Sequence, residues 1–212
     1  MFYSCSPASF SHAPLRASRG ATAATVDIHC HVLTPEAAAL VKDALDPARE
    51  PMLVFANEET RAVNRKQEET IRAQLTSVEA RLEAMNKAGI DIQAISPAPQ
   101  YYYWAEPELG REASRLVNNR IAEIVASHPD RFVGLGTVPL QAPALAIREL
   151  ERCVGELGLP GVQIGTHVGA WNLDAPELFP FFTRAAELGA AVFVHPWDMI
   201  APERMRKYWL PW

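Results

Sequence analysis

Short apolar runs alternate with longer amphipathic stretches along this chain from residue 25 onward. The apolar runs are rich in β-branched residues and too short for independent helices, so they predict buried strands. Five of them stand out: residues 25–31 (TVDIHCH), 90–96 (IDIQAIS), 132–138 (FVGLGTV), 161–165 (GVQIG) and 190–195 (AAVFVH). Strands that alternate with helices predict a parallel sheet joined by crossover helices, and therefore the α/β class.

The amphipathic stretches carry apolar residues three and four positions apart, which is the spacing of one helix face. In the first stretch this spacing predicts one helix with a single apolar stripe, and Gly89 ends it. The residues of that stripe are Ile71, Leu75, Val78, Leu82 and Met85. Further helices are predicted around residues 116–125, 145–157 and 178–188. Their apolar faces are expected to pack on the sheet.

The last three predicted strands begin about thirty residues apart, the size of one βα unit. This repetition suits a (β/α)8 barrel, but a doubly wound sheet would give the same local signals. The glycine-rich first turn of a nucleotide-binding sheet is absent from the sequence. Periodicity alone therefore leaves the two architectures open.

Composition excludes some functional classes. The 212-residue chain is 49% hydrophobic and 21% charged, with a formal net charge of −5. It has no Lys/Arg cluster of the kind that phosphate backbones require, so nucleic acid is not an expected partner. Charge, Pro or Gly interrupts every apolar run long before it could span a bilayer, so no membrane association is expected.

The cysteines and the N-terminal stretch bear on localisation. The three cysteines, Cys5, Cys30 and Cys153, are too few and too far apart for a disulfide framework, which favours a reducing compartment and a cytoplasmic protein. Residues 1–24 lack acidic residues and are rich in Ser and Ala, which is mildly similar to an organelle transit peptide. A disordered extension or an over-extended start is the alternative. Residues 25–212 are expected to form one domain.

Histidines mark the ends of two predicted strands. His29 and His31 are two residues apart in the first strand, so their side chains project from the same face and can chelate one metal ion. Asp27 is a candidate acceptor for a ring N–H, with a cap or a salt bridge as equally open roles. His195 ends the fifth strand, where Pro196 stops it. If these strands meet across a barrel, three imidazoles converge in a set that suits Zn(II) or a similar divalent ion.

Motifs over most of residues 26–212 resemble the amidohydrolase superfamily, and within it the group around 2-amino-3-carboxymuconate-6-semialdehyde decarboxylase. The motifs are VDIHCH (26–31), Tyr103-Trp104-Ala105, RFVGLGTVPLQAP (131–143), ELGLPGVQIGTHV (156–168), FVHPWDM (193–199) and KYWLPW (207–212). The resemblance favours a TIM (β/α)8-type metal-dependent hydrolase barrel. It also implies that the three histidines are metal ligands.

The resemblance adds expectations about the site. It places Trp197 near the substrate. The segment after the fourth strand offers Thr166 and His167 at the mouth of the barrel, where either could line the pocket, although a hydrogen bond within the loop is the favoured role for His167. Family members hold substrate carboxylates with cationic side chains, for which Arg61 is the first candidate, with Arg65 and Arg72 as others. The fourth strand carries no lysine of the type that bridges two metals, so a single ion is expected.

The implied activity is metal-dependent, non-oxidative decarboxylation of a small unsaturated or aromatic carboxylic acid by a homodimeric enzyme. A lactonase-like hydrolase of the same superfamily, or a non-catalytic remnant, is the alternative. Two family residues are not found before Trp212: a histidine in a His-Gly-Gly context after strand six and an aspartate ligand after strand eight. We therefore expect about five of eight βα units and no proton-transfer residue within this chain.

Overall fold

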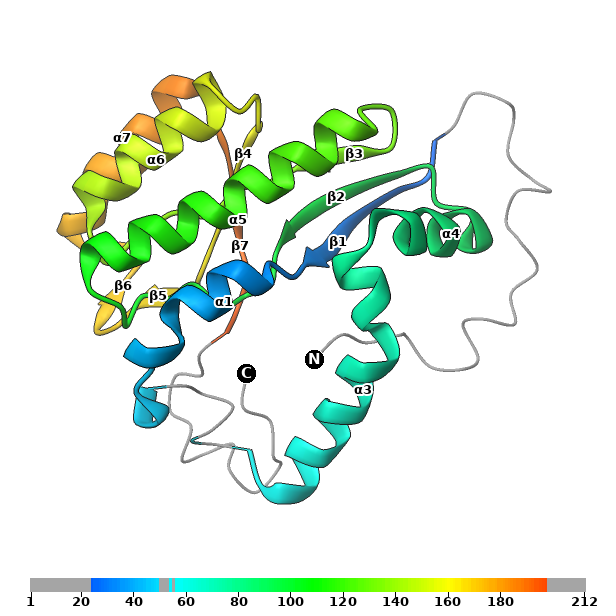
Figure 1. Ribbon diagram of the computed structural model, residues 1–212. Coiled ribbons are helices and arrows are strands. Elements are labelled where there is room, and N and C mark those ends of the chain that lie inside the picture. Colours follow the sequence, from blue (N-terminus) through cyan, green and yellow to red (C-terminus); the bar gives the residue numbers. More distant parts are fainter. Residues whose placement is uncertain (1–23, 50–53, 55, 198–212) are drawn as a thin grey trace.

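The computed structural model describes residues 24–49, 54 and 56–197 (Figure 1). Residues 1–23 of the expected N-terminal extension lie outside this described part. So do Asp198 and Met199 of the FVHPWDM motif and the whole of KYWLPW. The fold can therefore be compared with the prediction from the first strand to the residues just beyond the fifth.

All five predicted strands are present in the described residues: β1 (Val26–Val32), β2 (Ile92–Pro97), β3 (Phe132–Gly134), β4 (Gly161–Ile164) and β7 (Ala191–Val194). Parallel pairing joins β1 to β2, β2 to β3, and β4 to β7. A parallel bridge between Gly136 and Val162 connects the chain after β3 to β4. The strands therefore follow one another in chain order along a single parallel arc.

The third strand is shorter than the predicted run of residues 132–138, although the residues just after Gly134 still bond to both neighbouring strands. The N–H of Leu135 still donates to Ile95 on β2, whereas the N–H of Gly136 donates to Gly161 on β4. Consecutive N–H groups thus point to the strands on either side, as in any central strand, so this segment lies between β2 and β4. A side chain at Gly136 would also press on Cys153 and Asn118, at 2.8 and 2.9 Å from its Cβ.

Helices cover one face of this arc. The main ones are α1 (Pro35–Val41), α5 (Pro107–Ser127), α6 (Pro143–Gly155) and α7 (Phe179–Leu188), with short 3₁₀ turns at Lys42–Ala44, Pro47–Arg49 and Pro176–Leu178. Helices α5, α6 and α7 lie side by side (Figure 1). Their apolar faces form one core with the strands, in which Ile121, Leu150 and Phe181 are fully buried. The expected helix faces are confirmed here.

The predicted single helix through residues 71–85 is wrong, because the chain breaks at Ser77. Helix α3 (Glu58–Thr76) ends there and α4 (Val78–Ala88) begins. The Ser77 hydroxyl accepts a hydrogen bond from the N–H of Ala80 at 3.2 Å and donates to the Glu79 carboxylate at 2.8 Å. This is an N-cap, which the unbroken apolar spacing concealed. Gly89 ends α4 in the left-handed conformation with φ 74°, as expected.

Replacing Ser77 with alanine is expected to lower the free energy of unfolding by about 1 kcal/mol, since the first turn of α4 loses its cap. Ser77→Asn keeps an oxygen acceptor for the N–H of Ala80 and is expected to remain close to the original stability. Urea unfolding followed by circular dichroism measures both variants. Equal destabilisation by Ala and Asn would show that the cap does not hold this helix break.

A small hairpin that the sequence did not predict follows β4. Strands β5 (His167–Val168) and β6 (Trp171–Asn172) pair antiparallel around Gly169, whose φ is 58°. Each strand has only two residues, which is too short for an alternation pattern to show. The hairpin places His167 beside the C-terminal end of β4.

No helix within the described ranges is long and apolar enough to cross a membrane. Several strand residues are nevertheless exposed, among them Val26 (52%), Ile28 (64%) and Val194 (43%). They lie on β1 and β7, the first and last strands of the described arc. Unpaired edges with exposed apolar residues are surfaces that another chain segment can cover.

Candidate metal centre

Three histidines from the two ends of the strand arc meet at one point. The Nε2 atoms of His29 and His195 are 2.9 Å apart, and those of His29 and His31 are 3.2 Å apart. Among the described residues, these three histidines form a cluster of potential metal ligands. Their ligand atoms all lie within 4.8 Å of one another. The predicted convergence of strands one and five is therefore present in the structure.

Backbone carbonyls fix the orientation of two of these rings. The Nδ1 atom of His31 lies 2.9 Å from the carbonyl oxygen of Pro97, and the Nδ1 atom of His195 lies 2.7 Å from that of Pro196. A carbonyl oxygen only accepts, so each Nδ1 carries the hydrogen and each neutral ring has its lone pair on Nε2. Both lone pairs are thus available to the centre of the cluster.

The protonation states suit metal binding. Burial, with a smaller contribution from the neighbouring His195, lowers the pKa of His31 to about 3. Burial also lowers the pKa of His195. Both rings are therefore neutral at physiological pH, which is the form that binds divalent cations.

The spacing of the nitrogens fits one small divalent cation. Two imidazole nitrogens about 2.1 Å from one ion lie about 3.0–3.4 Å apart when they subtend an angle between 90° and 109°. The observed separations of 2.9 and 3.2 Å are close to this range. The donor set therefore fits a single ion.

Neighbouring polar side chains hold the two strand ends that carry His31 and His195. The amide of Gln163, which is fully buried on β4, donates to the same Pro97 carbonyl at 3.0 Å. The hydroxyl of Tyr101 donates to the carbonyl oxygen of His195 at 3.0 Å. Burial raises the pKa of Tyr101 far above its usual range, so the hydroxyl stays a donor. The sequence signal for Gln163 was a polar residue inside a buried strand.

Asp27 does not take the role proposed for it from the sequence. Its carboxylate accepts from the backbone N–H of His29 at 3.1 Å and from the amide of Gln93 at 3.3 Å, whereas the ring of His31 turns to Pro97. Gln93 in turn accepts from Arg81, a buried cation that the sequence analysis did not single out. The sequence signal for Arg81 was its charge on an otherwise apolar helix face, one helical turn from both Val78 and Met85.

The residues predicted to contact substrate lie in different places. Trp197 is partly buried, two residues after His195. Thr166 and His167 contact each other, with 3.2 Å between the hydroxyl and Nδ1, at the start of the β5–β6 hairpin. The Nε atom of Arg61 donates to the carbonyl oxygen of Ala56 at 3.0 Å. Their roles in binding stay predictions.

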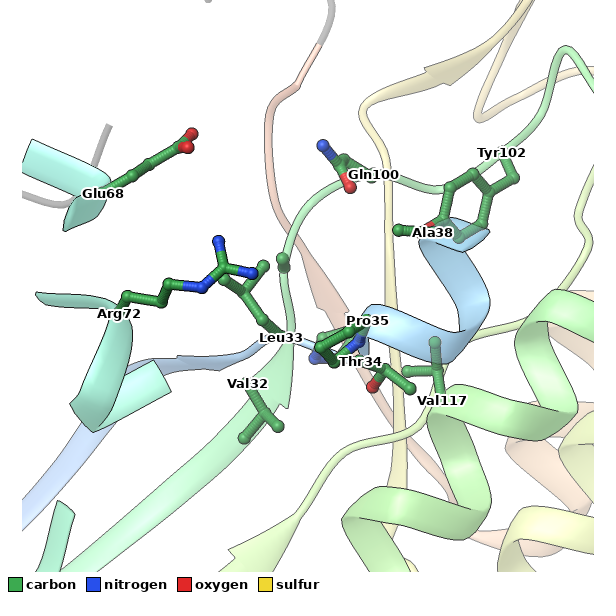
Figure 2. A pocket seen from close by; sticks show the side chains of 12 residues that line it. Val32, Leu33, Thr34, Pro35, Ala38, Glu68, Arg72, Gln100, Tyr102 and Val117 are labelled. Atoms are coloured by element: carbon green, nitrogen blue, oxygen red, sulfur yellow. The ribbon is translucent and has the colours of Figure 1, made fainter. Parts of the chain in front are cut away.

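A hollow of about 310 Å³ lies beside the C-terminal ends of β1 and β2, where His31 and its acceptor Pro97 are found. Arg72 and Glu68 from α3 face Gln100 and Tyr102 across it (Figure 2). Arg61 and Arg65 do not line it. Of the three arginines considered from the sequence, Arg72 is therefore the one that the structure places at this hollow.

Comparisons with known proteins show the family of this chain. The family model described as Amidohydrolase (Amidohydro_2) matches residues 26–207. A 2-amino-3-carboxymuconate-6-semialdehyde decarboxylase from Dictyostelium discoideum is 47% identical over 135 residues, which cover 63% of this chain and 38% of that protein. The chain thus spans less than half the length of this relative.

Solved structures share the fold. A 5-carboxyvanillate decarboxylase from Sphingomonas paucimobilis superposes with a TM-score of 0.71 at 28% identity over 87% of this chain and 55% of its own. A dihydroxybenzoic acid decarboxylase from Polaromonas sp. JS666, solved with manganese and the inhibitor 2-nitroresorcinol, gives 0.67 at 28% identity, covering 87% and 52%. The described strands are part of a TIM-type barrel, as predicted, and the chain belongs to the amidohydrolase family.

Proposed function

We propose that His29, His31 and His195 hold one divalent metal ion, and that this centre serves the non-oxidative decarboxylation of a small unsaturated or aromatic carboxylic acid. The convergence of three Nε2 atoms from β1 and from the end of β7 carries this proposal. The relatives and solved neighbours described above are decarboxylases of such acids. A substrate resembling 2-amino-3-carboxymuconate-6-semialdehyde is the first to test.

The chain's own residues would contribute binding and orientation. A divalent ion held there would act as a Lewis acid that stabilises negative charge on the substrate. The carbonyls of Pro97 and Pro196 keep two imidazoles turned toward that position. Arg72 at the adjacent hollow offers a cation for a substrate carboxylate. The donor of the proton that replaces CO2 is not assigned to any described residue.

The identity of the ion is a separate question. Three imidazoles suit Zn(II), which the sequence predicted, but a solved neighbour contains manganese. We propose a single divalent ion of this group, to be identified by elemental analysis of the purified protein. A homodimer and a cytoplasmic location remain predictions from the sequence.

Activity is tested by incubating the metal-loaded chain with 2-amino-3-carboxymuconate-6-semialdehyde, 2,6-dihydroxybenzoate and 5-carboxyvanillate while CO2 release is recorded. We expect CO2 from at least one acid and none after dialysis against a chelator. A lactone substrate is included in parallel. Ring opening of the lactone without CO2 from any acid would replace the decarboxylase proposal with the hydrolase. Metal binding without either reaction would leave the non-catalytic alternative.

A further inference from the structure

Arg81 on α4 is a buried cation that reaches the strand carrying the metal-site histidines. Its side chain is among the buried charged groups, with only 6% of the residue exposed. The guanidinium donates to the backbone carbonyl of His31 and to the side-chain oxygen of Gln93, the latter at 3.1 Å. Burial lowers its pKa, yet arginine keeps its charge in proteins. Burying a charge in this position costs free energy unless hydrogen bonds replace those that the charge made with water.

Strand β1 is irregular between Asp27 and Cys30. Asp27 pairs with Gln93 and Cys30 pairs with Ile95, so three steps along β1 match two steps along β2. This is a β-bulge with one extra residue on β1. Gln93 and Ile95 are two apart on a regular strand and share a face, and therefore Asp27 and Cys30 share that face as well.

The bulge separates Asp27 from the two histidines. In a regular strand Asp27, His29 and His31 would all project from one face, because they are two residues apart. With the extra residue, Asp27 faces the helix-covered side with Gln93, while His31 projects from the opposite face toward the cluster. The carboxylate is thereby moved away from the metal position and toward Arg81.

A bulge leaves part of the backbone ladder unmade, and side chains of one network bond to the backbone in the bulge and just after it. The Asp27 carboxylate accepts from the N–H of His29 at 3.1 Å, and Arg81 donates to the carbonyl of His31. Gln93 joins the two, since its amide donates to Asp27 and its oxygen accepts from Arg81. One network therefore contacts the backbone of both histidines of β1.

We infer that Arg81 is a positioning residue of the metal centre, which holds the bulged strand so that His29 and His31 direct both Nε2 atoms at one cation. This inference rests on the proposed metal centre. Without Arg81 the carbonyl of His31 and the oxygen of Gln93 lose their charged donor, and the bulged segment is free to relax. The spacing of the two rings then changes although neither ligand has been altered.

The experiment compares Arg81→Met and Arg81→Lys with Arg152→Met in the full 212-residue chain. Arg152 is a matched control: it is buried, and it bonds to Glu149 at 2.7 Å and Asn119 at 2.9 Å, away from the histidines. Co²⁺ serves as the probe, because its visible spectrum reports ligand geometry and its dissociation constant can be measured by titration. All measurements are made below the unfolding temperature of each variant, determined by circular dichroism.

We expect Arg81→Met to weaken Co²⁺ binding by about 10–100-fold and to shift the visible spectrum, as losses of groups that orient metal ligands do. Arg81→Lys, which keeps the charge but replaces the forked guanidinium with a single ammonium group, is expected to be intermediate. Arg152→Met is expected to lose stability but keep the affinity and spectrum of the original chain.

The results separate the two proposals. If the unaltered chain binds no Co²⁺, the metal centre and this inference both fail. If it binds Co²⁺ and Arg81→Met binds equally well with the same spectrum, the inference alone is wrong. The same holds if Arg152→Met weakens binding as much as Arg81→Met at matched stability, because Arg81 would then act only through general folding.

Discussion

Replacing His31 with alanine is expected to abolish stoichiometric metal binding by the folded chain. His31 is the most buried of the three histidines, at 5% exposure, and its pKa of about 3 keeps the ring neutral and ready to bind a cation. Removing one of three ligands should weaken affinity by more than about 100-fold, which exceeds the usual effect of removing an orienting neighbour. Elemental analysis and competition with a chelator measure this loss for Zn²⁺ and Mn²⁺.

The variant is expected to remain folded, since the Pro97 carbonyl that loses the imidazole keeps the amide of Gln163 as a donor. His128→Ala is the matched control. His128 ends α5 just before β3, at the opposite ends of the parallel strands, and its ring contacts Ser127. It should bind metal like the original chain. Unchanged metal content in the His31 variant would rule out the proposed ligand set.

Replacing Gly161 with alanine is expected to have the largest effect on stability, because there is no room for a side chain where β4 meets β7. A Cβ at this position would lie 2.0 Å from the carbonyl oxygen of Ala191, a backbone atom that cannot move without breaking the β4–β7 pairing. We expect the free energy of unfolding to fall by more than about 3 kcal/mol, at the upper end of what overpacking costs. Chemical denaturation measures the loss.

The same substitution should impair metal binding from a distance, since pairing with β4 places the strand that ends in His195. Gly155→Ala provides the control at the last residue of α6, where a Cβ would meet nothing within 4 Å. It should be neutral or stabilising by up to about 1 kcal/mol. Similar losses in both variants would contradict the account of the strand contact.

The sequence predicted those features of the fold and of the site that depend only on residues close together in the chain. Apolar runs of strand length located all five parallel strands, and the three- and four-residue spacing located the helix faces. The positions of His29, His31 and His195 at strand ends were readable as well, because parallel strands bring their carboxyl ends to one edge. The break at Ser77 was missed, since the apolar spacing runs unchanged across it.

Other features depended on pairing between distant segments. The bulge between Asp27 and Cys30 is defined only by the register against β2, so nothing in the sequence of β1 predicted that Asp27 would turn away from the histidines. Arg81 was not singled out from the sequence, because its burial depends on how α4 packs. Likewise, the choice of Arg72 over Arg61 at the hollow follows from the course of α3.

By itself, then, the sequence determined which residues could bind a metal and that they lie on strands of a parallel sheet, because strand periodicity and side-chain chemistry are properties of neighbouring residues. Only the tertiary structure decided that the Nε2 atom of His29 lies 2.9 and 3.2 Å from those of His195 and His31, and which groups hold the rings there. The physical reason is that curvature of the arc, the bulge in β1 and the burial of Arg81 and Gln163 arise from contacts between residues far apart in the chain.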